Sequence, residues 1–360
     1  MRLTERIQLV FSFVGLLFAL GGSSVLHAEN FPRLTVVNLN IWAGLHEMDF
    51  ERLDLQIQGM RQYSPDIITL QEAYDERGKR IYRNSLPEFD AVSFDGPAPS
   101  NLTLTGMNAL VDSMATVHRA TGLFPYISGT REMFRGDGYG LKILGRRGPE
   151  SSLQQETKIL REYQTRGSGR FSTAAFVDRL KPRAYLAVQY QTENGPILLV
   201  NTHWSNGVKN PRRLAVAQEL VAAIKELQRL PSGELMPVIL TLDSNADDAE
   251  PEMRYLTQQA RDTFHDKNPD LAKAPFGGKT WCGANCHTRG RLIEPDQRVD
   301  YIFTFPGSHR YLHTLESRLA FTDSPFVSDH FGVLSVLELR PQPEPLGCPA
   351  LFGDGSGTIK

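Results

Sequence analysis

Cysteine, strong net charge and long apolar segments are all scarce in this sequence. Its 360 residues include 3 cysteines and carry a formal net charge of -2. A disulfide-dense scaffold and a uniformly cationic surface for nucleic acid are therefore excluded. Beyond residues 1–28 no segment has the roughly 20 apolar residues that a membrane span requires, and no repeat or low-complexity tract stands out. A globular composition at this length favours one large α/β domain.

Residues 1–28 differ in composition from the rest of the chain. Arg2 and Arg6 precede an apolar run over 9–20, and Val25-Leu26-His27-Ala28 follows. This order is typical of an export signal that is cleaved after Ala28, and an uncleaved membrane anchor is the alternative. We predict a signal peptide at 1–28, a domain at 29–341, a tail at 342–360 and export to the periplasm or the medium.

Two of the cysteines lie close together in a segment that contains glycine. Cys282 and Cys286 are spaced for a small disulfide, which export would permit. Free thiols are the second interpretation. Zinc binding with His287 is the third, and it is disfavoured because a structural zinc site takes four ligands and no second pair is present.

Short apolar segments alternate with amphipathic ones along the chain. The pattern predicts strands at 34–40, 66–72, 139–144, 184–190, 196–203, 237–242, 299–305 and 332–337. It predicts helices at 49–63, near 107–120 and from Pro211 onward, and an Asn-Gly turn at 193–195. The rest of 86–130 and the polar residues 146–170 are expected to form loops.

Polar residues recur where the predicted strands begin or end. They are Asn40, Glu72, His203, Asp243, Asn245, Asp300, Asp329 and His330. Each one alone has an ordinary explanation, such as a turn cap or an ion pair between Asp300 and Arg298. Buried carboxylates cost several kcal/mol unless they are paired or bound to metal, so a set at strand ends indicates one shared site.

The residue types indicate the chemistry of that site. Carboxylate and amide oxygens suit a hard divalent cation such as Mg²⁺, Mn²⁺ or Ca²⁺. Two histidines without a paired Ser or Cys nucleophile argue against acyl transfer. Asp329 next to His330 can orient the imidazole as a general base. Together these groups favour metal-assisted hydrolysis of a phosphate ester by water.

Six short motifs, taken in order, resemble those of the endonuclease/exonuclease/phosphatase superfamily. They are Leu39-Asn40-Ile41-Trp42, Leu70-Gln71-Glu72, Asn201-Thr202-His203, Leu242-Asp243-Ser244-Asn245, Arg298-Val299-Asp300-Tyr301-Ile302 and Ser328-Asp329-His330. The resemblance spans about 34–339. It implies an α/β (α+β) fold, a four-layer sandwich of two mixed β-sheets flanked by helices, with the site at one edge.

The resemblance also implies a role for each site residue. Glu72 would be the principal ligand of Mg²⁺ (or Mn²⁺/Ca²⁺), with Asn40 and Asp329 beside it. His330 would be the general base, with Asp300 as the carboxylate that polarises it.

The remaining roles concern the phosphate. Asp243 and Asn245 would orient the attacking water and the scissile phosphate, or hold a second metal. His203 would stabilise charge on the phosphate or the leaving group. The sequence departs from the family pattern at Leu242, where Gly is usual, and at Gly145, where Ser is usual. These departures leave the carboxylates intact and put substrate contacts in doubt.

Superfamily membership does not identify the substrate. The 39–44 opening and Lys181-Pro182-Arg183 resemble neutral sphingomyelinase-type members slightly more than nucleases, which favours a phospholipid headgroup. A secreted nuclease is the alternative, because 131–183 holds 12 Lys or Arg against 6 Asp or Glu and such a surface can follow a nucleic-acid backbone. An inositol- or sugar-phosphate phosphatase comes third. A binding protein that lost the chemistry is the non-enzyme alternative. A monomer without an obligate protein partner is expected.

Overall fold

The computed structural model describes residues 31–41, 50–73, 82, 84–93, 140–146, 153–163, 183–205, 211–281, 283–285, 287–288 and 296–343. The chain divides into Met1–Phe31 and Pro32–Lys360, and the fold below is that of the second unit. The predicted signal peptide, the three cysteines, the predicted helix at 107–120 and the tail beyond 343 lie outside the described residues. Within the described residues no helix combines the length and apolarity needed to cross a membrane.

Two six-stranded sheets form the body of the domain. Sheet A has the order β11-β12-β1-β2-β4-β3, with β11 Arg310–Ala320, β12 Gly332–Pro341, β1 Arg33–Asn40, β2 Ile67–Gln71, β4 Lys142–Arg146 and β3 Phe89–Ser93. Sheet B has the order β5-β6-β7-β8-β10-β9, with β5 Gln154–Glu162, β6 Ala184–Thr192, β7 Gly195–His203, β8 Val238–Asp243, β10 Asp300–Phe305 and β9 Arg261–Asp262.

Each sheet is mixed for the same topological reason. In sheet A only β1 and β2 pair in parallel, and the connection between them carries helix α2, Phe50–Tyr63. In sheet B only β7 and β8 pair in parallel, and helix α7, Pro211–Leu227, connects them. Parallel neighbours require such a crossover, whereas the other pairs in both sheets are antiparallel.

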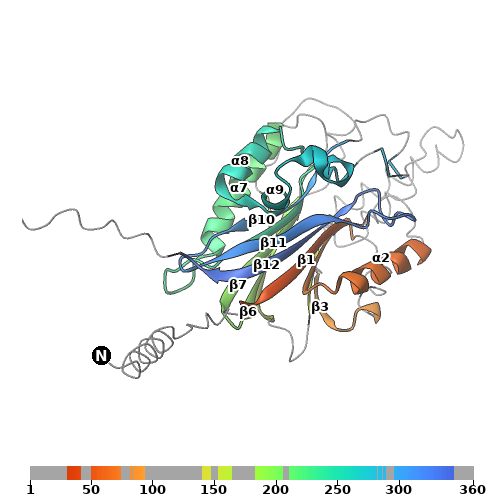
Figure 1. Ribbon diagram of the computed structural model, residues 1–360. Coiled ribbons are helices and arrows are strands. Elements are labelled where there is room, and N and C mark those ends of the chain that lie inside the picture. Colours follow the sequence, from red (N-terminus) through yellow and green to blue (C-terminus); the bar gives the residue numbers. More distant parts are fainter. Residues whose placement is uncertain are drawn as a thin grey trace, which may run out of the picture. The chain divides into compact units, whose positions relative to one another are not determined.

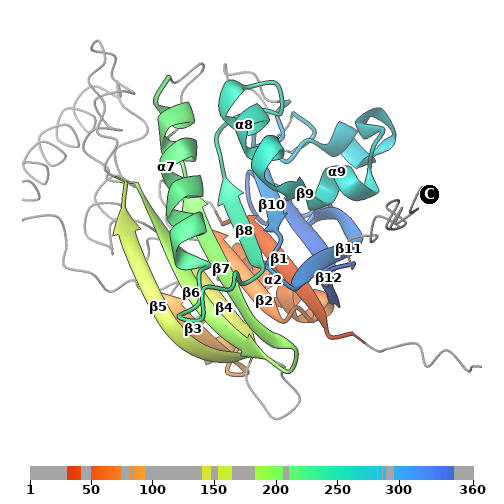
Figure 2. The ribbon, with the colours of Figure 1, turned by 90° about the vertical axis from the view of Figure 1, so that its left-hand side faces the viewer.

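Helices α2 and α7 cover the outer faces of the two sheets (Figures 1 and 2). One apolar cluster lies between the sheets and includes Val36, Ile143, Val188 and Ile302. A second lies between sheet B and helices α7 and α8, Pro251–Gln259, and a third lies between sheet A and α2. The order is helix, sheet, sheet, helix. This confirms the predicted four-layer α/β sandwich of two mixed sheets.

The predicted strands match the interior of each sheet, whereas the edges were mispredicted. β5 occupies part of the predicted loop at 146–170, and β3 lies in the predicted loop region after 86, so both predictions were wrong. β12 also extends to Pro341, past the predicted end at 337. An edge strand pairs on one side only, so its sequence needs less apolar surface and its local pattern is weaker.

Candidate active site

Three of the predicted site residues form one row across sheet B. His203 ends β7 and pairs with Asp243, which ends β8. Asp243 pairs in turn with Asp300, which begins the antiparallel strand β10. The row exists because the parallel strands end at the same edge where β10 starts. All three side chains are buried.

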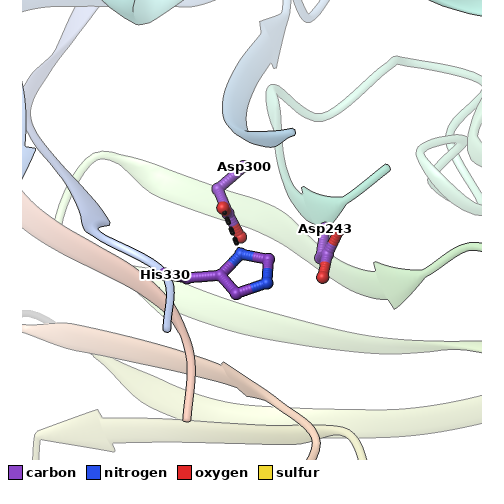
Figure 3. Close-up of side chains that lie close together, drawn as sticks. All are labelled: Asp243, Asp300 and His330. Carbon is purple, nitrogen blue, oxygen red and sulfur yellow. Dashed lines mark hydrogen bonds and ion pairs between the residues drawn. The ribbon is translucent and has the colours of Figure 1, made fainter. Parts of the chain in front are cut away.

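His330 reaches this row from the segment just before β12. Its Nδ1 donates a hydrogen bond to Asp300 Oδ2 at 2.8 Å, as Figure 3 shows. Burial lowers the pKa of His330, but the Asp300 carboxylate, its hydrogen bond and the nearby Asp329 and Asp243 together raise that pKa well above its usual value. Asp329 is the more distant partner, with Oδ1 3.9 Å from His330 Nε2.

Asp243 connects the two sheets at the site. Asn40, at the end of β1, donates from Nδ2 to Asp243 Oδ2 at 2.8 Å, and the Asn245 main-chain N–H donates to Oδ1 at 3.0 Å. Burial, followed by repulsion from Asp300, raises the pKa of Asp243 to about 7. A carboxylate with this pKa changes charge near neutral pH, which makes the row responsive to a bound cation or phosphate.

Asn245 places a second amide beside the row. Its Nδ2 lies 3.0 Å from His203 Nε2 and donates to the Trp204 carbonyl oxygen at 3.0 Å. The backbone of Asn245 has a φ of 49°, a left-handed conformation that asparagine tolerates better than most residues. This turn directs the amide back toward His203, whose Nε2 is also 3.4 Å from Asp243 Oδ2.

Glu72 lies at the corresponding edge of sheet A. It follows Gln71, the partner of Asn40 in the parallel pair of β1 and β2, and its own φ is 57°. A left-handed glutamate is strained, and such strain concentrates at functional sites. Its Oε2 is buried and has no hydrogen-bond partner in the described part of the chain. A buried carboxylate oxygen left unsatisfied costs several kcal/mol, which a bound cation would offset.

Hydrogen bonds join the end of β1, which carries Asn40, to the segments that carry Glu72 and Asp329. The Ile41 N–H donates to the Gln71 carbonyl at 3.1 Å, and the Ser328 hydroxyl donates to the Asn40 carbonyl at 2.6 Å. The three residues therefore lie on neighbouring segments at one edge of sheet A. This donor set fits a hard divalent cation.

A second grouping of possible ligands consists of Asp243, Asp300 and His330, whose nearest ligand atoms all lie within 4.8 Å of one another (Figure 3). The proton on His330 Nδ1 already occupies Asp300 Oδ2. The trio can therefore orient a base, and Glu72 with Asn40 and Asp329 offers a separate set of oxygen donors for a cation.

The sequence did not reveal what fixes the segment that carries Asp329 and His330. Three consecutive carbonyls of this segment contact side chains from elsewhere in the chain. The pairs are His287 Nε2 with Phe326 O at 3.0 Å, Gln56 Nε2 with Val327 O at 2.7 Å and Asn285 Nδ2 with Ser328 O at 2.8 Å. No spacing rule links residues so far apart, so only the folded chain identifies them.

Both departures from the family pattern have a packing explanation. Leu242 is fully buried in the cluster between sheet B and its helices. Gly145 faces the other sheet, and a Cβ at this position would lie 2.8 Å from the Tyr190 hydroxyl oxygen. These two positions therefore contribute to the packing of the domain.

Solved structures with this fold come from several sources. A humanized TDP2 of D. rerio is 16% identical with a TM-score of 0.57, covering 85% of this chain and 99% of its own. A D. rerio TDP2 complexed with single-strand DNA product is 15% identical with a TM-score of 0.56 and the same coverage. The mannosyl-6-phosphatase of Bacteroides thetaiotaomicron is 18% identical with a TM-score of 0.57, again covering 85% and 99%. At these identities the similarity shows the fold alone.

The sequence comparisons give the family. No curated protein matches the chain. The sequence model of the Endonuclease/Exonuclease/phosphatase family matches residues 37–330, from the middle of β1 to His330, and so covers most of the chain. The match includes every predicted site residue, and it confirms the resemblance seen in the six motifs. The chain belongs to the endonuclease/exonuclease/phosphatase family, whose members hydrolyse phosphoester bonds.

Proposed function

We propose that this protein is an exported, divalent-metal-dependent phosphoesterase that hydrolyses a phosphodiester with His330 as general base. The observation that carries the proposal is the 2.8 Å hydrogen bond between His330 Nδ1 and Asp300 Oδ2, beside the row of Asp243 and His203. A fixed Nδ1–H leaves Nε2 as the atom that accepts a proton. Family membership supports the reaction class.

His330 removes the proton from the attacking water. Asp300 is buried and holds the imidazole in one orientation, and its negative charge stabilises the imidazolium that forms. The raised pKa of His330 makes it a strong proton acceptor in its neutral form. The neutral fraction grows as pH increases, so turnover should rise with pH through this titration.

The amide and imidazole groups around Asp243 contact the phosphate of the substrate and orient the attacking water. Asn245 Nδ2 and His203 Nε2 lie 3.0 Å apart and form a polar pair that can face phosphoryl oxygens. Asp243 is held by hydrogen bonds from Asn40 and Asn245, so its free electron pairs are set to orient the water. These groups are in place before substrate arrives.

Glu72, Asn40 and Asp329 would hold the cation, with Mg²⁺ the first choice and Mn²⁺ or Ca²⁺ the alternatives. The support is the buried Glu72 Oε2, which has no hydrogen-bond partner among the described residues. When bound, the ion would polarise a phosphoryl oxygen and offset the charge that builds up on it.

For the substrate we propose a phospholipid headgroup of the sphingomyelin type. The support is the resemblance of the 39–44 opening and of Lys181-Pro182-Arg183, together with the export signal predicted at 1–28. Residues 42–44 and 181–182 lie outside the described residues, as does most of the cationic stretch 131–183. We expect the enzyme to act as a monomer without an obligate protein partner.

A substrate panel tests this proposal. Purified protein with Mg²⁺ or Mn²⁺ is assayed on sphingomyelin, lysophospholipids, DNA, RNA, mannose 6-phosphate and inositol phosphates, with a chelated control. Sphingomyelin should be cleaved fastest. Faster cleavage of DNA or RNA would instead identify a nuclease, and faster cleavage of a monoester would identify a phosphatase.

A second measurement separates an enzyme from a binding protein. Bis-(p-nitrophenyl) phosphate is a generic diester that does not depend on headgroup recognition. Metal-dependent turnover that is lost in His330→Ala supports the enzyme. If no diester is hydrolysed, and His330→Ala binds ligands as the native protein does, the binding-protein interpretation holds.

A further inference from the structure

Below the row of site residues, a buried amide network joins the two sheets. Asn38 on β1, Gln71 on β2 and Asn201 on β7 are each fully buried. Gln71 Nε2 donates to Asn38 Oδ1 at 2.7 Å and to Asn201 Oδ1 at 2.7 Å. One amide nitrogen therefore connects a side chain of sheet A with a side chain of sheet B.

Asn38 extends this link to the strands that carry Asp243 and Asp300. From sheet A, its Nδ2 donates to the carbonyl oxygen of Leu242 at 3.2 Å and to that of Tyr301 at 3.4 Å. Leu242 directly precedes Asp243, and Tyr301 directly follows Asp300. One side chain of sheet A thus contacts the backbone beside both carboxylates of sheet B.

Asn201 makes the reciprocal contacts. From sheet B, its Nδ2 donates to the carbonyl oxygens of Leu70 and Lys142, both at 3.0 Å. Leu70 lies on β2, two residues before Glu72. In each sheet, therefore, one asparagine side chain donates to main-chain carbonyl oxygens of the other sheet, close to that sheet's proposed functional residues.

The partners determine the orientation of every amide. Carbonyl oxygens only accept, so both asparagines must turn their amino groups toward the backbone and their oxygens toward Gln71. Gln71 must then present Nε2, and its Oε1 is buried with no partner among the described residues. A flipped Gln71 would set one oxygen against two others. The network has a single arrangement, and it leaves one acceptor unsatisfied, which destabilises the fold.

The link matters because the site is divided between the sheets. Of the proposed cation ligands, Asn40 ends β1, Glu72 follows β2 and Asp329 precedes β12, all strands of sheet A, whereas Asp243 and Asp300 lie on strands of sheet B. Facing sheets touch through side chains, and apart from polar contacts such as Asn40 with Asp243 and Ser335 with Thr263, the rest of their interface is the apolar cluster. Apolar contacts are non-directional and set no fixed offset between sheets.

We propose that Gln71, together with Asn38 and Asn201, positions the cation half of the site against the base-and-phosphate half. This inference rests on the proposed function, because it assumes that both halves act on one substrate. The network touches no reacting atom, so its members are positioning residues.

Asn201→Leu tests the inference, because Asn201 lies on the sheet without the cation ligands. With bis-(p-nitrophenyl) phosphate and Mn²⁺, kcat should fall about 10- to 100-fold, as is usual when a residue that positions the metal ligands is lost. The Mn²⁺ dissociation constant, measured by calorimetry, should stay within about threefold, because sheet A keeps all its ligands. A parallel loss of Mn²⁺ affinity and kcat would overturn the inference.

Ser335→Ala is the matched control. Ser335 is also fully buried and polar, and its Oγ lies 2.9 Å from Thr263 Oγ1 and 2.8 Å from Ser317 Oγ, away from the site strand ends. It should lose stability yet keep kcat within about twofold, as is usual for a site that shares no partner with the reaction. If Asn201→Leu matches this control in kcat, the inference is wrong.

If Asn201→Leu does not fold, a milder variant tests the same network. Thr69→Val keeps the shape and removes a hydroxyl that donates to Asn38 Oδ1 at 2.9 Å. Its kcat should fall about threefold or more with Mn²⁺ affinity unchanged, a smaller effect because one bond is lost. An unchanged kcat in this variant would count against the network.

A readout without turnover separates this inference from the proposed function. Bound Mn²⁺ broadens the imidazole signals of His203, which lies on sheet B, according to the distance between them. Asn201→Leu should alter this broadening and Ser335→Ala should not. Equal broadening in all three proteins would overturn the inference, whereas absent turnover in the native protein would overturn only the proposed function.

Discussion

The two halves of the site differ in which groups contact their carboxylates. On sheet B, His203, Asp243 and Asn245 contact one another within 3.4 Å, so this half is organised without any ligand. Beside sheet A, Glu72 has a buried carboxylate oxygen with no hydrogen-bond partner among the described residues. Sheet B also leaves Asp300 Oδ1 without a hydrogen-bond partner among the described residues, but its two carboxylates each contact an amide or an imidazole, whereas the donor set of sheet A fits a cation.

The largest effect on kcat is expected from His330, which lies just before β12 of sheet A and is hydrogen-bonded to Asp300 of sheet B. His330→Ala should lower kcat about 10²- to 10⁴-fold in steady-state assays, because the general base is lost. Asp300→Asn should have a comparable effect, since an amide at this position no longer stabilises the imidazolium. The double variant should be no worse than the poorer single one. Retention of more than about a tenth of native activity by His330→Ala would refute its role as general base.

Glu72→Gln and Asp243→Asn distinguish the halves directly. Glu72→Gln should weaken Mn²⁺ binding about tenfold or more, because the sheet A half loses its principal negative charge. Asp243→Asn should keep Mn²⁺ affinity within about threefold while kcat falls about 100-fold. Calorimetry and saturation kinetics measure the two quantities. Equal losses of Mn²⁺ affinity in both variants would mean that the cation is shared between the halves.

The raised pKa of Asp243 predicts a pH-dependent stability cost in the sheet B half. A carboxyl whose folded pKa of about 7 exceeds its ordinary value of 3.8 binds protons more tightly when folded. Stability is therefore lost as pH rises from about 4, and the loss is complete above about 7. Asp243→Asn should stabilise the metal-free protein at pH 8 by roughly 1–4 kcal/mol, and by less at pH 5.

Thermal melts in chelator at the two pH values check this prediction. Asp54→Asn is the control, because Asp54 is an exposed carboxylate on α2. Its effect on the melting temperature should be the same at both pH values. A gain for Asp243→Asn that is independent of pH would show that the charge of Asp243 is not what destabilises the fold.

The smallest effect on activity is expected from a substitution in the turn that leads into β7, at the end opposite His203. Gly195 has a φ of 104° and no atom within 4 Å of where a Cβ would lie. Gly195→Ala should therefore cost about 1–2 kcal/mol through backbone strain alone. Denaturant unfolding measures this cost, and kcat should be unchanged because His203 lies at the opposite end of the strand. A fall in kcat would show that the sheet B half is less independent than its contacts suggest.

The strands show how far sequence patterns reach in this fold. Among the described residues, every strand that the sequence predicted lies inside a sheet, as β1, β2, β4 and β12 do in sheet A. The strands it missed are the edges: β3, β5, β9 and β11. Interior strands pair with a neighbour on both sides, and their sequences are nearly continuous apolar runs. An edge strand such as β5, with Ile159 and Leu160 among polar residues, is stabilised by its neighbour more than by its own composition.

By itself, the sequence determined which polar groups end the interior strands, because a carboxylate or imidazole after an apolar run must be paired or bound to something. It also determined the fold class and the family. The family resemblance already gave Asp300 as the partner of His330, and the tertiary structure shows that contact. Only the tertiary structure decided that Asn38, Gln71 and Asn201 join the sheets. The physical reason is range: strand periodicity relates residues two apart, whereas these contacts join residues 30 to 130 positions apart and depend on how one sheet packs against the other.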